Sequence, residues 1–161
     1  MKNWSAYVRA CYALLKPGGY LELQDTVGMS IAHVNHGILQ LEPWDEKCHA
    51  VAKELGMDYE CGVHLEKYMR EAGFEVVSRE EEMLPFGTWL SEEGRPETER
   101  MGRLMEVQQR GMARIYARRT LEGLESEEVI REYERMAGEQ NIEERGAYRP
   151  LYLAVGRKPL R

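Results

Sequence analysis

Histidine side chains are the residues of this sequence whose type best suits acid–base chemistry, because imidazole titrates near neutral pH. His33 and His36 stand close together, and His64 follows Cys61 at similar spacing. Each of these histidines could accept or donate a proton during a reaction. We therefore take His33, His36 and His64 as candidate catalytic residues.

The same two pairs, His33 with His36 and Cys61 with His64, also have the spacing of metal ligands. A tetrahedral zinc site needs four such ligands that converge on one point. The long stretch between the two pairs gives no sign of that convergence. We favour histidines that are structural or line a pocket, and we expect no bound metal.

The composition excludes several classes of protein. Of the 161 residues, 43% are hydrophobic and 31% are charged, with a net charge of −6. This hydrophobic content supports a packed core and excludes a fully disordered chain. The mixed charge offers no basic surface for nucleic acid. Arg114, Arg118 and Arg119 have runs of glutamate nearby, which favours a solvated helix face.

No stretch of the sequence is apolar enough, over sufficient length, for a signal peptide or a membrane span. We therefore expect a soluble, cytoplasmic protein with no membrane partner. The three cysteines are an odd set in a chain too large to need disulfides, so we expect reduced thiols. The length suits one domain over residues 1–161.

Hydrophobic periodicity predicts an α/β chain. Asn3 or Ser5 can cap a first helix, which the Lys16-Pro17-Gly18-Gly19 turn ends. The further elements that we expect are a strand over 20–25, a helix capped by Asp45, a second helix ending at Gly73, a strand from Phe74 towards Pro85, a long methionine-striped helix over 96–122, a helix capped by Ser126, and a last strand over 151–155 opened by Pro150.

The segment from Leu14 to Asp25, LLKPGGYLELQD, resembles the entry to the fifth strand of class I S-adenosylmethionine-dependent methyltransferases. Trp44 with the helix after it, and the stretch from His64 to Phe74, are similar to the elements that follow in that family. Pro85-Phe86-Gly87-Thr88-Trp89 resembles a P-x-G-x-W stretch of fungal secondary-metabolism methyltransferases. The resemblance runs to Pro159 and implies the C-terminal half of that fold.

This resemblance implies a partial Rossmann-like sheet with a helical insertion. The family's strand order is 3-2-1-4-5-7-6, with strand seven antiparallel, and this chain would supply strands 5, 7 and 6. Segments 26–62 and 91–146 would be substrate-side helical insertions within one truncated domain. The glycine-rich loop and the acidic residue that hold the cofactor in the family precede the region of resemblance. We expect no S-adenosylmethionine binding unless a partner supplies that half.

The resemblance also places candidate site residues. Asp25, at the carboxyl end of its strand, would lie in the family's reaction crevice and joins the three histidines as a candidate catalytic residue. The segment after strand five and the helical insertion wall the substrate cavity in the family, which makes Tyr59 and Trp89 candidate substrate-binding residues. Met105 and Met112 could line an adaptable apolar cavity, although a methionine stripe is more often core.

The family's strand order leaves one edge of strand five without its neighbour, strand four. Leu21 and Leu23 would make that edge apolar, and such edges invite pairing with another chain. We therefore expect a homodimer or a heteromeric partner at this edge. The alternative is that a loop, such as segment 27–43, covers it.

Three functions fit these observations. The first is a cofactor-free enzyme that holds an apolar natural-product intermediate and promotes its cyclisation or rearrangement, since holding a reactive conformer lowers the barrier. The second is a subunit of a split or hetero-oligomeric methyltransferase. The third is a non-catalytic interaction module. We rank the first slightly ahead of the second.

Overall fold

The computed structural model describes residues 3–34, 43–139, 142 and 145–160. The chain folds as two compact units, each of which packs mainly within itself. We call them the sheet unit, which comprises Met1–Gly28, Leu55–Glu82 and Pro150–Arg161, and the helical unit, which comprises Met29–Glu54 and Met83–Arg149. The expectation of one domain over residues 1–161 stays a prediction.

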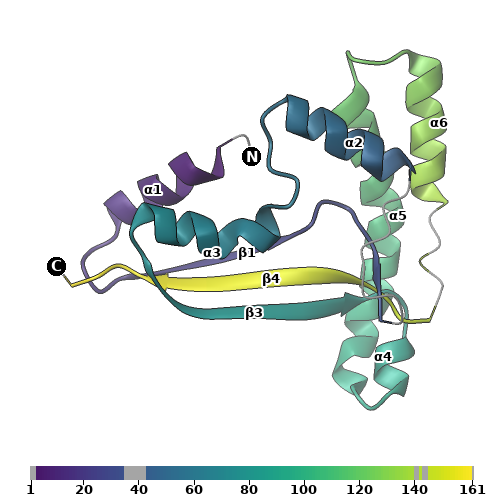
Figure 1. Ribbon diagram of the computed structural model, residues 1–161. Coiled ribbons are helices and arrows are strands. Elements are labelled where there is room, and N and C mark those ends of the chain that lie inside the picture. The colour runs from purple at the N-terminus through teal and green to yellow at the C-terminus, as the bar shows by residue number, and fades with distance from the viewer. Residues whose placement is uncertain (1–2, 35–42, 140–141, 143–144, 161) are drawn as a thin grey trace. The chain divides into compact units, whose positions relative to one another are not determined.

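The elements follow an α/β order along the chain (Figure 1). They are α1 (Trp4–Leu14), β1 (Tyr20–Thr26), β2 (Ala32–His33), α2 (Pro43–Glu54), α3 (Cys61–Ala72), β3 (Glu75–Pro85), α4 (Trp89–Glu92), the short 3₁₀ helix η1 (Pro96–Thr98), α5 (Glu99–Leu121), α6 (Glu127–Gly138) and β4 (Ala147–Arg157). Asn3 caps α1 as expected, because its side chain accepts a hydrogen bond from the Ala6 amide at 2.8 Å.

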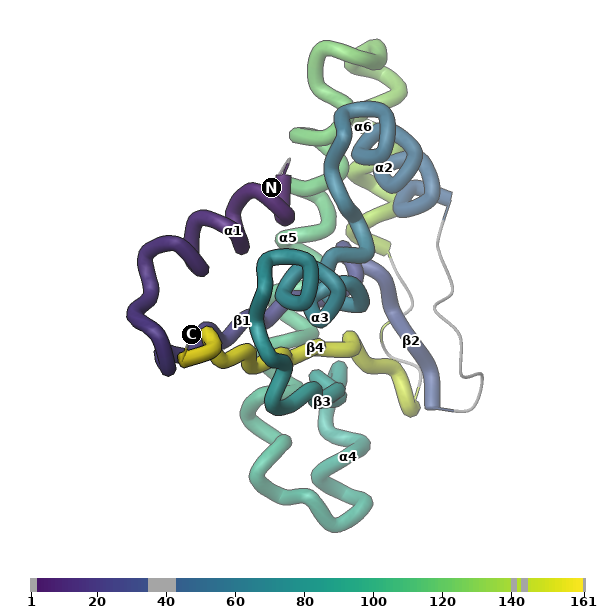
Figure 2. Tube along the Cα trace, turned by 60° about the vertical axis from the view of Figure 1, so that its left-hand side comes forward, coloured from purple at the N-terminus to yellow at the C-terminus, as the bar shows by residue number. Residues whose placement is uncertain are grey.

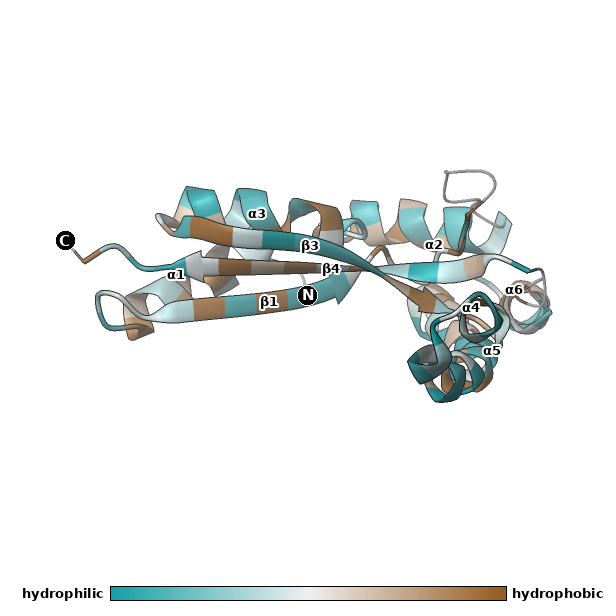
Figure 3. Cartoon of the chain, turned by 90° about the horizontal axis from the view of Figure 1, so that it is seen from below, coloured by the Kyte–Doolittle hydropathy of each residue, from teal (hydrophilic) through white to brown (hydrophobic). Residues whose placement is uncertain are grey.

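Strand β4 is the centre of the sheet. It pairs antiparallel with β1, from Tyr20 opposite Arg157 to Thr26 opposite Leu151, and it also pairs with β3. Figure 3 shows β4 between these two strands. This arrangement is the order 5-7-6 that the resemblance implied, and the partial Rossmann-like α/β fold is confirmed. Strand β2 adds a short antiparallel pairing, Ala32 and His33 against Tyr148 and Ala147.

Helices α1 and α3 cover one face of the sheet unit (Figure 1). Gly62, near the start of α3, makes this close packing possible, because a Cβ there would lie 2.8 Å from the Thr26 carbonyl oxygen and from the Tyr152 ring. Gly156 of β4 faces Met69 and Phe74 on the same side. Leu21 lies opposite Gly156 and Leu23 opposite Ala154, so both leucines point into this core.

That orientation corrects the expectation of an apolar strand edge. Leu23 is buried and Leu21 is half-buried beneath the helices, so neither side chain makes the outer edge of β1 apolar. The edge itself is present: β1 stands at the end of the strand order, and no strand that the structure describes pairs with its other side. The exposed side chains of Tyr20, Glu22 and Gln24 lie along this strand.

The helical unit is built on contacts between small residues. Ala113 and Ala117 of α5 and Ala137 of α6 are fully buried in one cluster, which Trp44 and Cys48 of α2 complete. Figure 2 shows α2, α5 and α6 together. Alanine lets the axes of α5 and α6 come close together, and the large Trp44 side chain fills the space beside them.

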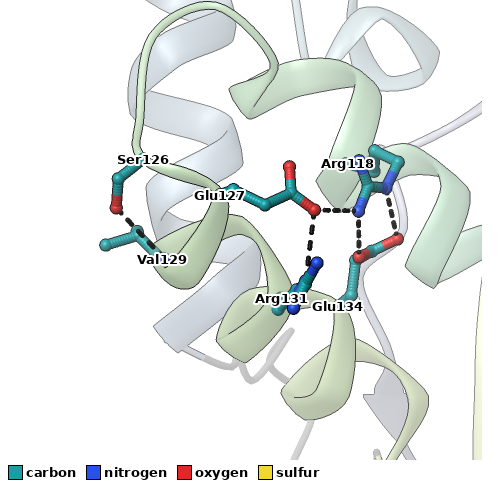
Figure 4. A network of polar contacts seen from close by, with 6 residues as sticks. All are labelled: Arg118, Ser126, Glu127, Val129, Arg131 and Glu134. Carbon is teal, nitrogen blue, oxygen red and sulfur yellow. Dashed lines mark hydrogen bonds and ion pairs between the residues drawn. The ribbon is translucent and has the colours of Figure 1, made fainter.

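Polar contacts join α5 to α6 at the surface of this unit (Figure 4). The Arg118 guanidinium donates to Glu134 at 2.8 Å and to Glu127 at 2.9 Å, and Arg131 also donates to Glu127. Ser126 caps α6 as predicted, with its hydroxyl oxygen accepting from the Val129 amide. The expected pairing of this arginine-rich stretch with nearby glutamates is therefore confirmed at Arg118.

Two expected features of the elements are wrong, and a third holds only in part. The last strand begins at Ala147, and Pro150 lies within it. Asp45 lies inside the first turn of α2, fully buried, where it accepts a hydrogen bond from Ser30 at 2.7 Å. The methionine stripe is only partly the buried side of α5: Met105 is buried, but Met112 is 44% exposed, and the buried side also carries Gly102, Gln109 and the alanines.

Candidate functional site

The strongest cluster of reactive side chains gathers around Asp58, which lies just before α3 in the sheet unit. One carboxylate oxygen, Oδ2, accepts a hydrogen bond from the Tyr68 hydroxyl at 2.5 Å and lies 2.8 Å from His64 Nδ1. The other oxygen accepts from the Glu60 amide at 3.0 Å. His64 and Tyr68 are four residues apart on α3 and thus share one face of the helix.

Electrostatics fix the protonation of Asp58. Burial of this carboxyl raises its pKa, but the hydrogen bonds from Tyr68 and His64 outweigh burial, so the pKa of Asp58 lies below its ordinary value. The carboxylate is therefore ionised at neutral pH. Burial, and then the hydrogen bond to this carboxylate, raises the pKa of Tyr68, so the phenol keeps its proton and remains a donor.

This arrangement orients the imidazole of His64. An ionised carboxylate can only accept hydrogen bonds, so Nδ1 must donate to Asp58, and in the neutral ring the lone pair is on Nε2. The His64 side chain is 39% exposed, which leaves the ring open to a ligand. This pairing of an imidazole with a carboxylate is the arrangement by which catalytic triads orient their histidine.

Cys61 and Asp25 lie at the same end of α3. Burial, and then a hydrogen bond to Asp25, raises the pKa of the Cys61 thiol to about 12. The thiol is therefore neutral at pH 7 and donates to the Asp25 carboxylate, which also accepts from the Thr26 amide at 2.8 Å. The negative charge of Asp58 adds to the effect on Cys61. Two of the predicted catalytic residues, Asp25 and His64, thus belong to one polar cluster.

Two aromatic side chains support this cluster. Trp4 of α1 stacks on Tyr68, with the ring centroids 6.3 Å apart and an angle of 11° between the planes. Tyr59, predicted to bind substrate, is buried against Gly28, where a Cβ would fall 2.0 Å from the tyrosine ring. Tyr59 thus packs the loop that leads to Asp58 and Cys61.

The remaining predicted site residues belong to the helical unit or are not described. His33 is buried in β2, and Met105 is buried with Ile31 and Phe86, whereas Met112 is largely exposed. Trp89 is buried, and its indole nitrogen donates to the Ala147 carbonyl at 3.0 Å. His36 lies outside the described residues. Asp25 and His64 are therefore the predicted catalytic pair that the structure brings into one unit.

Asp58 and Tyr68 were not predicted from the sequence. The signal for Tyr68 was its position four residues after His64 on a predicted helix, where the two side chains must be neighbours. Asp58 precedes that helix in a loop whose course no periodicity reveals. Only the folded loop shows that its carboxylate turns back to both side chains.

The alternative of a metal site has no support in the described part of the chain. There, no three histidine, cysteine, aspartate or glutamate side chains converge in a way that could hold a metal ion. Cys61 is directed to Asp25 and His64 to Asp58, so the predicted Cys-His pair already has other partners.

Gly18 and Gly19 are adjacent glycines, the residue type that forms cofactor-binding loops in dinucleotide folds. Gly18, with φ of 80°, and Gly19 form the turn between α1 and β1. Their backbone groups pair with the C-terminal segment: the Gly18 amide donates to the Lys158 carbonyl at 2.9 Å, and the Lys158 amide donates to the Gly19 carbonyl at 2.8 Å. This glycine pair therefore serves the fold and does not cradle a ligand.

Within the described residues, no helix has the length and apolarity that crossing a membrane requires.

Comparison with known proteins finds similarity to a fungal methyltransferase. Methyltransferase pytC of Aspergillus terreus is 28% identical over 119 residues, which cover 66% of this chain and 33% of pytC. The sequence is related to that of a methyltransferase. The protein of the same name from Aspergillus terreus strain NIH 2624 matches with the same identity and coverage. The chain spans about a third of the length of these relatives. No family model matches the sequence. No solved structure matches it either.

Proposed function

We propose that this methyltransferase-like protein binds an apolar natural-product intermediate and promotes its cyclisation or rearrangement by proton transfer at His64, without a cofactor. The observation that carries the proposal is the 2.8 Å contact between His64 Nδ1 and the Asp58 carboxylate, with the imidazole partly exposed. A cofactor-independent reaction is consistent with a glycine turn already paired to the C-terminal segment.

The reaction needs no other reagent. His64 Nε2 takes a proton from an acidic C–H or O–H group of the bound intermediate, and the electron pair left behind forms the new bond or moves the double bond. The imidazolium then returns the proton to another atom of the same molecule, so the net change is an isomerisation. Asp58 stays ionised throughout and stabilises the imidazolium.

A carbon-acid probe tests this function before the natural substrate is known. In 5-nitrobenzisoxazole, a base removes the ring C–H proton, the N–O bond breaks, and a coloured cyanophenolate forms. We expect the wild-type protein to exceed the rate of free imidazole at the same concentration. His64→Gln should lose at least about tenfold, since general bases contribute about 10²–10⁴ on native substrates. Asp58→Asn should lose less.

His49→Gln is the matched control, because it removes a partly exposed histidine of α2, in the other unit. This variant should keep the wild-type rate. Equal rates for wild type and His64→Gln, both folded by circular dichroism, would reject His64 as the base. A metal assay on the same samples would separate metal-dependent chemistry from the proposed one.

A second function is favoured by the unpaired edge of β1. As a subunit of a split methyltransferase, the protein would offer this edge to a partner that holds S-adenosylmethionine. Calorimetry should then detect no binding of S-adenosylmethionine to this protein alone, but binding after addition of a pytC fragment that lacks the matched third. Absence of binding in the mixture, with both components folded, would count against this function. If the protein is inactive in the carbon-acid assay and the mixture does not bind S-adenosylmethionine, the remaining function is that of a non-catalytic interaction module.

A further inference from the structure

The helical unit contains a pocket of about 290 Å³ at the motif over Pro85–Trp89. Phe86, Trp89 and Ile142 are its apolar lining residues, and Glu106 and Arg145 are charged residues of its wall. Phe86 and Ile142 are almost fully buried, and the Trp89 ring is fixed by its hydrogen bond to the Ala147 carbonyl. The surrounding residues therefore hold these three side chains in place, and each presents only a small part of its surface to the pocket.

Two glycines bring Glu106 into this pocket. A Cβ at Gly102 of α5 would lie 1.8 Å from the Gly87 carbonyl oxygen, so no other residue allows the helix to approach the loop so closely. The Gly87 amide also donates to the Gly102 carbonyl at 3.1 Å. Glu106 stands one helical turn after Gly102, on the same face. Its Oε2 lies 3.9 Å from the Cβ position at Gly87.

The other charged groups of the pocket are already paired. The Arg145 guanidinium donates to Glu92 at 2.8 Å and to Glu93 at 2.9 Å. The Thr88 hydroxyl donates to the second oxygen of Glu92 at 2.8 Å. Arg145 therefore has its charge balanced by two carboxylates and offers little to an anion. The half-buried Glu106 has no ion-pair or hydrogen-bond partner among the residues that the structure describes.

We propose that this pocket binds a small organic ammonium ion, with the ammonium group on Glu106 and an apolar ring or chain against Phe86, Trp89 and Ile142. A carboxylate that lacks a partner beside apolar walls favours a cation with several N–H donors, because charge-assisted hydrogen bonds are the stronger kind. The volume is near the lower end of the range of ligand pockets, about 300–1,000 Å³, and admits roughly one ring. This site does not depend on the proposed role of His64.

The test uses three probes of one shape and different charge: benzylammonium, benzyl alcohol and benzoate. Binding is followed by the indole N–H resonance of Trp89 in NMR spectra, with those of Trp4 and Trp44 as internal references. We expect benzylammonium to shift the Trp89 resonance with an affinity about tenfold higher than that of benzyl alcohol, and benzoate to give no shift.

Glu106→Gln keeps the shape of the side chain and should reduce benzylammonium to the affinity of benzyl alcohol. Glu122→Gln is the matched control, because it removes the same charge from the exposed end of the same helix and should leave the affinity unchanged. The proposal is overturned if benzylammonium leaves the Trp89 resonance unshifted, if benzoate binds as well, or if Glu106→Gln has no more effect than Glu122→Gln.

Discussion

The two units both bury large apolar side chains but differ in where small residues let their elements approach closely. In the sheet unit, large side chains such as Leu23, Met69 and Phe74 fill the space between helices and strands, and glycine is needed where α3 begins. In the helical unit, large side chains such as Trp44, Phe86 and Leu121 also fill the core, but alanines and glycines let α5 approach α6 and the Pro85–Trp89 loop. The stability cost of adding a methyl group should therefore depend on the unit. Both candidate sites lie where a glycine allows two elements to approach closely.

The sharpest test of this comparison is Gly102→Ala in the helical unit. The added methyl group would lie 1.8 Å from the Gly87 carbonyl oxygen, a backbone atom that cannot move aside without shifting the loop. We expect a loss of about 3 kcal/mol in the free energy of unfolding, at the upper end for overpacking. Thermal and urea denaturation measure it.

The matched control is Gly111→Ala on the same helix, where a Cβ meets nothing within 4 Å. Helix propensity alone should stabilise this variant by about 0.5–1 kcal/mol. If both alanine variants are equally stable, the close approach of α5 to the loop is not what limits this unit.

Glycine-to-alanine substitutions in the sheet unit should reduce the free energy of unfolding less than Gly102→Ala does, and the loss should differ between two positions. Gly62→Ala would place a methyl group 2.8 Å from the Thr26 carbonyl oxygen and 2.9 Å from that of Asp25, both backbone atoms. We expect a loss of about 2 kcal/mol. Gly156→Ala should cost less than Gly62→Ala, because only its nearest neighbour, the Phe74 Cβ at 2.9 Å, is fixed to the backbone, whereas the Met69 sulfur at 3.1 Å can adjust. The reverse order, measured by denaturation, would contradict this explanation.

The sequence predicted the sheet unit more completely than the helical unit, and the reason is physical. The Lys16–Gly19 turn and alternating leucines specify a helix followed by a strand through local interactions, and α1, β1, α3 and β3 lie close to where they were predicted. On α5, the sequence offers an aliphatic stripe with Leu104 and Ile115, but these are exposed, and the smaller residues pack inside. Periodicity identifies apolar faces and does not reveal which face the tertiary contacts bury.

The candidate site was predictable in the same uneven way. His64 was chosen for its chemistry and Asp25 for its place at the end of a strand, and both belong to the cluster. Asp58 could not be predicted, since its role depends on a loop that folds back on α3. Tyr59 and Trp89 were expected near a ligand, and Trp89 does line a pocket. The pocket also depends on Gly102, which the sequence marks only as a weak point in a helix.

The acid response of the sheet unit should depend on Asp58. Its pKa is lower in the folded chain than its ordinary value of about 3.9, so ionised Asp58 stabilises the fold above that pH, and this contribution disappears as the pH falls through the folded pKa. Asp58→Asn should therefore be less stable than wild type at pH 7, and the difference should shrink between about pH 4 and pH 2. A difference that stays constant over this range would show that Asp58 acts only through packing.

The smallest expected effect compares one thiol from each unit. Burial raises the pKa of both Cys48 and Cys61 to about 12, so both should react slowly with iodoacetamide at pH 8, and the half-buried Cys11 should react first. After burial, the hydrogen bond to Asp25 is the next largest cause of the raised pKa of Cys61. For Cys48, the next largest cause is the negative charge of Asp45. Asp25→Asn should therefore raise the alkylation rate of Cys61 a few-fold and leave that of Cys48 unchanged, as mass spectrometry of the labelled peptides can measure. Faster labelling of both thiols would mean that the substitution loosens the whole chain; unchanged labelling of Cys61 would mean that burial alone keeps its thiol protonated and that Asp25 remains free to act on a ligand.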